Sequence, residues 1–279
     1  MIDIHKVNFQ YLSSSTKIFE NLSLQIEKGE FVGIIGPTGC GKSTLCYMLN
    51  GLIPYSIKGY FSGDVSVSGK KLVDETVEEM SSVVGYMLQE PSFQIATPNV
   101  TSEIAFGMEN LGIAREEIVK RLDSVLETLG IDYLKNRATA DLSEGEKQRV
   151  ILASILAMEP QVLVLDECSS MLDLPSKLEL ATILKQLNTK EQKTIVMVEH
   201  DLDYLLELVD RIILINNGQI VADGPAAKIL TDVDLLRDND LVPPTIVRLF
   251  QEIQNESKIT VDIPASYSQA TEQLRRMLK

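Results

Sequence analysis

The stretch that decides the fold is Gly36-Pro37-Thr38-Gly39-Cys40-Gly41-Lys42-Ser43-Thr44. It meets the spacing G-x-x-x-x-G-K-[ST], follows the apolar run 31–35 and precedes a helical pattern. Glycines let such a loop curl so that main-chain N–H groups point at an anion, and the start of the helix adds partial positive charge. We expect Lys42 to reach the β- and γ-phosphates and Ser43 to bind Mg²⁺. Because strand and helix are both present, the stretch predicts binding of a nucleoside triphosphate rather than a chance match in a glycine-rich turn.

The overall composition limits the classes of protein to which this chain can belong. Its 279 residues, 44% of them apolar, suffice for one large α/β domain with a modest appendage. No apolar run approaches the roughly 20 residues that cross a bilayer, and the first residues do not resemble a signal peptide, so we expect a cytosolic location. A net charge of −14 argues against a broad nucleic-acid surface. The three cysteines predict reduced intracellular thiols rather than a disulfide framework.

Hydrophobic periodicity divides the chain into strands and helices. Strands are expected at residues 2–9, 22–26, 31–35, 63–69, 162–165, 194–198 and 211–215, and helices at about 101–130, 144–158, after Pro175, 245–253 and 269–278. This alternation predicts a parallel-sheet nucleotide domain at residues 1–230, with a helical insertion at about 90–160. Residues 231–279, where the charge rises and Pro243 and Pro244 interrupt the chain, are expected to form a C-terminal extension.

Two carboxylates follow the buried strand predicted at residues 162–165. Parallel strands carry such groups to the carboxyl edge of the sheet, where the phosphate loop also lies. Asp166 is then placed to hold Mg²⁺ through its water shell, and Glu167 to polarise a water for in-line attack on the γ-phosphate. The alternative is an ordinary strand end with solvated acids, and the phosphate loop beside it argues against that interpretation.

Further elements resemble the ATP-binding cassette (ABC) ATPases. Residues 142–149, Leu-Ser-Glu-Gly-Glu-Lys-Gln-Arg, resemble the family's LSGGQ signature. Gln89 matches the Q-loop glutamine, and His200 matches the switch histidine. Residues 170–173 stand where the family has its D-loop, and Tyr11 stands where an aromatic ring stacks on adenine. The resemblance implies an α/β fold, a P-loop NTPase cassette with an antiparallel β subdomain, a helical insertion and a small C-terminal α/β appendage.

The resemblance also implies an ATPase with ATP and Mg²⁺ as cofactors, and it assigns the candidate site residues. Those expected to bind ATP are Tyr11, Gly36, Pro37, Thr38, Gly39, Cys40, Gly41, Lys42, Ser43, Thr44 and, in the signature, Ser143 and Gly145. Those expected to hold Mg²⁺ are Ser43, Gln89 and Asp166. The expected catalytic residues are Glu167, His200, Lys42 and Gln89.

A narrower resemblance concerns the energy-coupling factor (ECF) branch of the family, which drives vitamin and transition-metal importers. It is carried by residues 94–100, 103–107 and 109–112, and by Leu-Val-Pro-Pro at 241–244 before the two expected C-terminal helices. The alternatives are the ATPase subunit of a conventional ABC transporter and a regulatory cassette that binds ATP with little turnover. Glu167 and His200 disfavour the second. A cassette protein of translation or DNA repair would usually carry two cassettes or a coiled-coil insertion.

The resemblance implies partners as well. Two cassettes of this family dimerise head to tail, so the partner here is a second ABC ATPase subunit, in a heterodimer or a homodimer. An integral membrane coupling subunit and a substrate-binding membrane subunit are implied too, which places the chain peripherally on the cytoplasmic face of the cell membrane. We expect Glu90, Glu103 and Glu109 to offer acidic contacts to a helix of the membrane partner, with plain solvation as the alternative.

Two features depart from expectation or invite a test. Glu144 stands where the family signature has glycine, which suggests a heterodimer whose site completed by this signature is the weaker one; a permissive variant is the alternative. Cys40 lies within the phosphate loop near Lys42, and that positive setting predicts a thiolate-prone cysteine. The transported substrate does not follow from the sequence.

Overall fold

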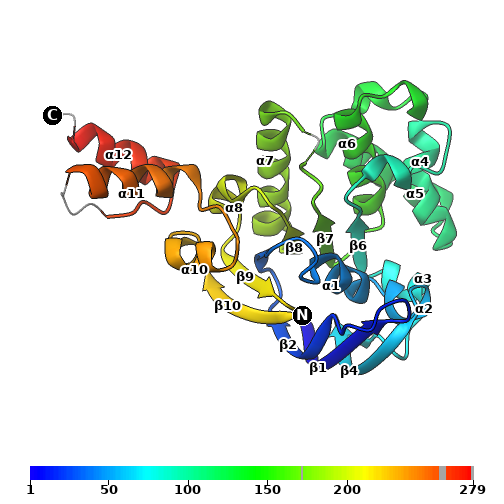
Figure 1. The fold of residues 1–279 in the computed structure, drawn as a ribbon. Helices are drawn as coiled ribbons and strands as arrows, with labels where there is room; N and C mark the ends of the chain where they lie inside the picture. The colour runs from blue at the N-terminus through cyan, green and yellow to red at the C-terminus, as the bar shows by residue number, and fades with distance from the viewer. Residues whose placement is uncertain (171, 258–261, 278–279) are drawn as a thin grey trace.

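The computed structural model of the protein describes residues 1–170, 172–257 and 262–277. Met171 of the predicted D-loop and Leu278 of the predicted last helix lie outside the described residues. The strands form two sheets, and the helices lie around them (Figure 1). Among the described helices, none combines the length and apolar character that crossing a bilayer requires.

The larger sheet carries the candidate site. Its order is β10-β9-β3-β8-β7-β6, parallel from β9 to β6, with β10 antiparallel at the edge. The strands are β3 (Phe31–Ile35), β6 (Val84–Met87), β7 (Val162–Asp166), β8 (Thr194–Val198), β9 (Arg211–Asn216) and β10 (Gln219–Pro225). Every residue of β3, β7 and β8 is buried. Helices cover both faces of a parallel sheet, which explains why its strands consist of continuous apolar runs.

The smaller sheet is the expected antiparallel β subdomain. Its order is β2-β1-β4-β5, from β1 (Ile2–Tyr11), β2 (Phe19–Ile26), β4 (Gly59–Val67) and β5 (Lys70–Lys71). In β2 buried and exposed residues largely alternate, as expected for a sheet with one face in the core. Its buried side chains join one hydrophobic cluster with those of α1 (Lys42–Leu49), the helix that follows the phosphate loop. The phosphate loop is therefore supported by both sheets.

The helical insertion lies at one end of the molecule, beyond β6 and β7 (Figure 1). It contains α4 (Val100–Asn110), α5 (Arg115–Thr128) and α6 (Glu144–Ala157), with 3₁₀ turns at Pro91–Gln94, Asp132–Leu134 and Thr139–Asp141. The side chain of Asn99 caps α4. Ser143 and Glu146 form a capping box at the start of α6, which explains why that helix begins where the sequence predicts.

The remaining helices connect the strands and form the extension. They are α2 (Leu52–Tyr55), α3 (Val77–Ser81), α7 (Leu174–Glu191), α8 (Leu202–Leu208), α9 (Ala226–Ile229), α10 (Val233–Asp238), α11 (Thr245–Ser257) and α12 (Tyr267–Met277). The α/β appendage expected at 231–279 is wrong in one respect: the described part of that segment is helical and contains no strand. Its apolar residues recur with the helical period, so that α11 buries Ile246, Val247 and Phe250.

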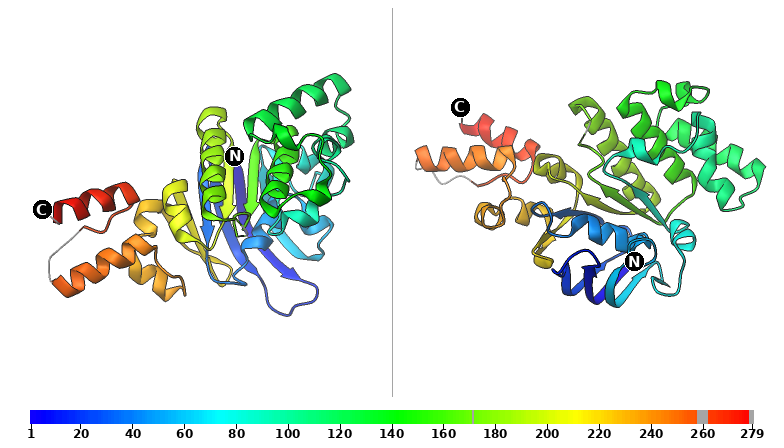
Figure 2. Two further views of the ribbon diagram at one scale, coloured as in Figure 1. Left: turned by 90° about the horizontal axis from the view of Figure 1, so that it is seen from above. Right: turned by 45° about the vertical axis from the view of Figure 1, so that its right-hand side comes forward.

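The C-terminal helices attach to α8 and project from the core at the end opposite the insertion (Figure 2). The carboxylate of Asp203 on α8 accepts hydrogen bonds from the N–H and hydroxyl of Thr245, both at 2.8 Å. It also accepts one from the hydroxyl of Tyr267 at 2.7 Å. The N–H of Tyr267 donates to Glu207, at 2.6 Å. Two acids on one short helix thus hold the starts of both α11 and α12.

Candidate functional site

The phosphate loop lies between β3 and α1, and its shape depends on two glycines. Gly36 has φ +152° and Gly41 has φ +113°. A Cβ on Gly36 would lie 2.0 Å from the carbonyl oxygen of Ile215, and one on Gly41 would lie 2.8 Å from the ring of Phe19. Any larger residue would displace main chain or a buried ring. The predicted motif glycines are therefore required by the packing of this loop.

The side chain of Lys42 stabilises the curl of the phosphate loop. This side chain is buried, and its amine donates to the carbonyl oxygens of Gly36 at 2.8 Å and Pro37 at 3.1 Å. A buried ammonium needs such partners, because an unpaired charge away from water is costly. The amine is thereby fixed within the curl of the loop, beside the cleft that the loop lines.

A cleft of about 410 Å³ opens above the loop. The cleft is lined by Ile18 and by ten of the predicted site residues, which are Tyr11, Thr38, Gly39, Gly41, Lys42, Ser43, Thr44, Gln89, Glu167 and His200. The hydroxyls of Tyr11 and Thr44 are 2.8 Å apart and hydrogen-bonded. The ring of Tyr11 meets that of Phe9 edge to face, with centroids 4.9 Å apart. Ile18 was not predicted from the sequence, because it lies in a turn whose position depends on the antiparallel sheet.

Asp166, at the end of β7, is only 3% exposed. Its Oδ2 accepts a hydrogen bond from the hydroxyl of Tyr86 at 3.2 Å, while its Oδ1 is buried without a hydrogen-bond partner. Burial raises the pKa of this carboxyl, and the hydroxyls of Ser43 and Tyr86 act against that rise. A buried carboxylate oxygen without a partner, beside a serine hydroxyl, suits a hard cation such as Mg²⁺.

Glu167 follows directly and is held by two other predicted residues. Its Oε2 accepts from the amide Nε2 of Gln89 at 2.7 Å, and its Oε1 lies 2.8 Å from Nε2 of His200. Its own backbone has φ +50°, a left-handed conformation that is uncommon for a residue with a side chain. Backbone strain of this kind clusters at functional sites. Gln89 and His200, from two separate loops, thus converge on the carboxylate of Glu167 at the cleft.

The predicted signature residues lie elsewhere in this chain. Ser143 caps α6, and Gly145 lines a small cavity between α6 and α7 rather than the cleft. Between them, Glu144 pairs with the amine of Lys147 at 2.7 Å and accepts a hydrogen bond from the hydroxyl of Ser92. Both contacts lower the pKa of the Glu144 carboxyl, and the contact with Lys147 has the larger effect.

Two sequence-based expectations require correction. Burial raises the pKa of the Cys40 thiol, and it outweighs the opposing effect of Lys42, so the predicted thiolate-prone cysteine is wrong. Glu103 does not offer a free acidic contact, because it is buried and its carboxylate accepts from the N–H groups of Ala96 and Thr97, at 3.0 and 2.8 Å. Glu90 and Glu109 are exposed, as expected.

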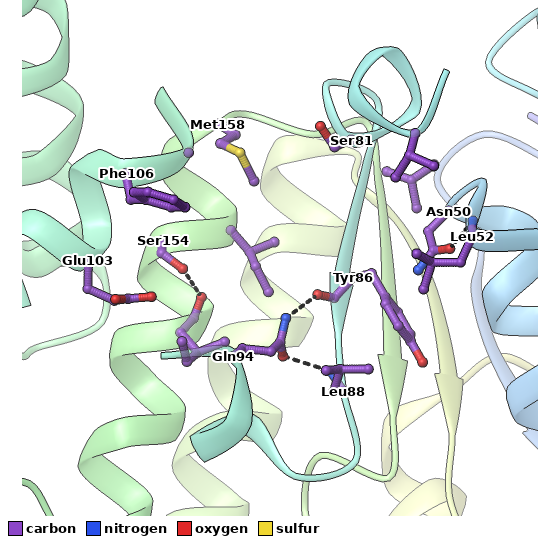
Figure 3. A pocket seen from close by; sticks show the side chains of 15 residues that line it. Asn50, Leu52, Ser81, Tyr86, Leu88, Gln94, Glu103, Phe106, Ser154 and Met158 are labelled. Atoms are coloured by element: carbon purple, nitrogen blue, oxygen red, sulfur yellow. Dashed lines mark hydrogen bonds between the residues drawn. The ribbon is translucent and has the colours of Figure 1, made fainter. Parts of the chain in front are cut away.

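A second depression of about 350 Å³ lies where the insertion meets the sheet (Figure 3). We call it the insertion groove; residues of β6, the following loop, α4 and α6 line it, with others from α2 and α3. At its floor the side-chain amide of Gln94 donates to the carbonyl oxygen of Tyr86 at 3.0 Å and accepts from the N–H of Leu88 at 2.8 Å. Neither Tyr86 nor Gln94 was predicted as a site residue from the sequence. Tyr86 could have been found from the strand pairing, because it lies opposite Val164, two residues before Asp166.

Comparison with known proteins agrees with this geometry. An ABC transporter ATP-binding protein of Pyrococcus abyssi is 38% identical over 100% of this chain and 99% of the relative. An energy-coupling factor transporter ATP-binding protein of Oenococcus oeni is 35% identical over 91% of this chain and 90% of the relative.

Solved structures give the same result. The structure of cbiO1 from Clostridium perfringens, described as part of the ABC transporter complex cbiONQ, superposes with a TM-score of 0.75 at 28% identity, over 90% of this chain and 98% of that one. A dimeric ATP-binding cassette bound to ADP and phosphate superposes with a TM-score of 0.69 at 26% identity, over 81% of this chain and 99% of that one. The ABC transporter family model matches residues 19–170. The protein therefore belongs to the ABC transporter family, whose ATP-binding cassettes are ATPases.

Proposed function

We propose that this chain is the ATP-hydrolysing, energising subunit of an ECF-type importer that takes up a vitamin or metal ion through membrane partners. The observation that carries the hydrolytic part is the pair of hydrogen bonds from Gln89 and His200 to Glu167, at the cleft behind the phosphate loop. The ECF part is supported by the relative from Oenococcus oeni, by the likeness to cbiO1, and by the motifs at 94–112 and 241–244.

ATP is proposed to bind in the cleft. The N–H groups of the loop from Gly36 to Gly41 and the start of α1 favour an anion, and the amine of Lys42 supplies a full positive charge beside them. The contacts of that amine with two loop carbonyls are ones that phosphate oxygens would share or replace. The ring of Tyr11, held by Thr44 and Phe9, is the proposed platform for adenine.

Mg²⁺ is proposed to be held by Asp166, Ser43 and Gln89, together with phosphate oxygens and water. Mg²⁺ is usually bound through one or two carboxylates together with substrate phosphates and keeps several waters, so a donor set with a single carboxylate and two neutral oxygen donors fits it. When bound, the ion neutralises charge on the β- and γ-phosphates. The partnerless Oδ1 of Asp166 is the feature of this site that favours a cation.

Glu167 is the proposed base that orients the attacking water and takes its proton. A carboxylate does this efficiently only when its orientation is fixed, because misplacement of a reacting group by about 1 Å can lower the rate about 10²-fold. Gln89 fixes one oxygen and His200 the other, which leaves the remaining lone pairs of Glu167 to the water. In this mechanism Gln89 and His200 both position the base.

The proposed assembly is a head-to-tail dimer of cassettes on the cytoplasmic face of the membrane. Ser143 and Gly145 lie outside this chain's own cleft, so in this proposal they complete the nucleotide site of a second ATPase subunit. The insertion groove is proposed to receive a helix of the membrane coupling subunit, and the exposed Glu90 and Glu109 are proposed to be available to basic residues of that subunit.

The test is co-purification followed by reconstitution. The chain is expressed with its candidate membrane partners, and ATP hydrolysis and substrate uptake are measured in liposomes. We expect uptake that requires ATP and is lost with Lys42→Ala. Steady hydrolysis without any membrane partner or uptake would contradict the importer assignment, and the absence of hydrolysis in the intact complex would favour a regulatory cassette.

A further inference from the structure

Tyr86 lies on the strand next to the one that ends in Asp166. In the parallel pairing of β6 with β7, Tyr86 is opposite Val164, and Asp166 is two residues further along. Because strand side chains alternate between faces, Tyr86 and Asp166 lie on the same face of the sheet. The hydroxyl of Tyr86 reaches the carboxylate and donates to Oδ2 at 3.2 Å. The sheet register itself therefore creates this contact.

Tyr86 is fixed at both its ring and its main chain. Its ring packs edge to face against that of Tyr47 on α1, with centroids 6.1 Å apart and planes at 88°. The amide of Gln94 bonds to the carbonyl oxygen of Tyr86 and to the N–H of Leu88, on either side of Met87 (Figure 3). A donor held this way has little freedom to leave its acceptor, so it can impose an orientation on Asp166.

We propose that Tyr86 is a positioning residue of the ATPase site, whose hydroxyl holds Oδ2 of Asp166 so that Oδ1 remains available to the divalent cation. The inference rests on the proposed role of Asp166 in holding Mg²⁺. The two oxygens differ as this requires, since Oδ2 is bonded and Oδ1 is buried without a partner. Without the hydroxyl, the carboxylate could rotate, and the cation would have to fix it on binding. Groups that orient a metal ligand in this way typically contribute about 10- to 100-fold to metal affinity.

The test is Tyr86→Phe, which removes the hydroxyl and keeps the ring. In the full-length protein assembled with its partner cassette, Mn²⁺ affinity is measured by electron paramagnetic resonance in the presence of ATP. Mg²⁺-dependent hydrolysis is titrated in parallel. We expect the Mn²⁺ dissociation constant, and the Mg²⁺ concentration for half-maximal hydrolysis, to rise about 10-fold. ATP affinity in EDTA should stay at the wild-type value, because the loop and Lys42 are untouched.

Tyr55→Phe is the matched control, since its hydroxyl donates to the carbonyl oxygen of Val73 on an exposed part of the chain, at 2.9 Å. It should leave the Mn²⁺ affinity unchanged. Unchanged Mn²⁺ affinity in Tyr86→Phe, or an equal loss of ATP affinity in EDTA, would overturn the inference. Asp166→Asn separates the two proposals: if it weakens Mn²⁺ binding while Tyr86→Phe does not, only this inference fails. If Asp166→Asn has no effect either, the proposed role of Asp166 fails as well.

Discussion

Two segments of the chain each hold one oxygen of Glu167, and they are supported in different ways. Gln89 lies in an exposed loop at the start of the helical insertion. The side chain of Gln94 holds the start of this loop by accepting a hydrogen bond from the N–H of Leu88. His200 lies between β8 and α8, directly before Asp201, which caps α8 and pairs with Lys177 of α7 at 2.8 Å. Both side chains are exposed, but the first contact belongs to the insertion and the second to the loop before α8, the helix to which the C-terminal extension is attached.

From this difference we expect the two contacts to serve different steps of the proposed transport cycle. A displacement of the insertion would reach Glu167 directly through Gln89. A displacement of the extension would first have to move α8, to which Asp203 and Glu207 attach it. We therefore expect changes on the Gln89 side to alter the coupling between hydrolysis and transport. Changes on the extension side should mainly alter stability.

The largest expected effect comes from Glu167 itself. Glu167→Gln keeps the shape of the side chain but removes the proposed base, so hydrolysis should fall by about 10²-fold or more while ATP binding is retained. Nucleotide binding and single-turnover hydrolysis are measured on the same preparation. Lys42→Ala is the contrasting variant, which should weaken ATP binding instead. If Glu167→Gln hydrolysed ATP at the wild-type rate, Glu167 would not be the base, and the two contacts that hold it would not matter for hydrolysis.

The comparison itself is tested by Gln89→Ala and His200→Ala. Each variant frees one oxygen of Glu167, so each should lower hydrolysis by about tenfold through poorer orientation of the base. In the reconstituted complex, His200→Ala should lower uptake and hydrolysis in proportion, whereas Gln89→Ala should also lower uptake per ATP. Equal uptake per ATP in both variants would show that the two segments are equivalent.

The sequence predicted those parts of the fold that depend on local pattern. The bounds of β3 and β8 match the predicted apolar runs, because strands buried on both faces have no polar positions to blur their limits. The start of α6 was predictable because its capping box is encoded within four residues. The convergence of Gln89, Glu167 and His200 followed from motifs in a known order, once the strands were placed in one parallel sheet.

Features that depend on packing could not be predicted in this way. Glu103 is held by N–H groups of Ala96 and Thr97, a contact that exists only once that loop has its shape. Cys40 lies in a charged loop by sequence, but its sulfur is buried close against Gly36, and burial controls its pKa. The contact of Tyr86 with Asp166 required the register of β6 and β7, which no local pattern specifies.

A smaller effect is expected where the extension joins the core. Asp203→Ala removes three hydrogen bonds that hold the starts of α11 and α12, each worth about 0.5–1.5 kcal/mol. Hydrogen exchange should accelerate in both helices, and hydrolysis should stay within about twofold of wild type because Glu167 keeps both its contacts. Glu272→Ala is the control, since its partner Arg276 is exposed on the same helix. A tenfold loss of hydrolysis in Asp203→Ala would mean that the extension acts on His200 after all.

The smallest effect is expected at Glu144, which stands where the family signature has glycine. Its carboxylate is more than half exposed and is paired with Lys147 and Ser92, so much of its charge is already compensated within the chain. Glu144→Gly should therefore raise turnover at the partner's site by less than about threefold. The measurement uses the proposed dimer of this chain with a second, distinct ATPase subunit, and this chain carries Lys42→Ala so that only the partner's site turns over. Lys147→Ala, which leaves Glu144 uncompensated, should slow that site. A gain of tenfold or more with Glu144→Gly would show that the carboxylate reaches the partner's nucleotide despite its pairing, and no response to either variant would mean that the signature tolerates Glu144 freely.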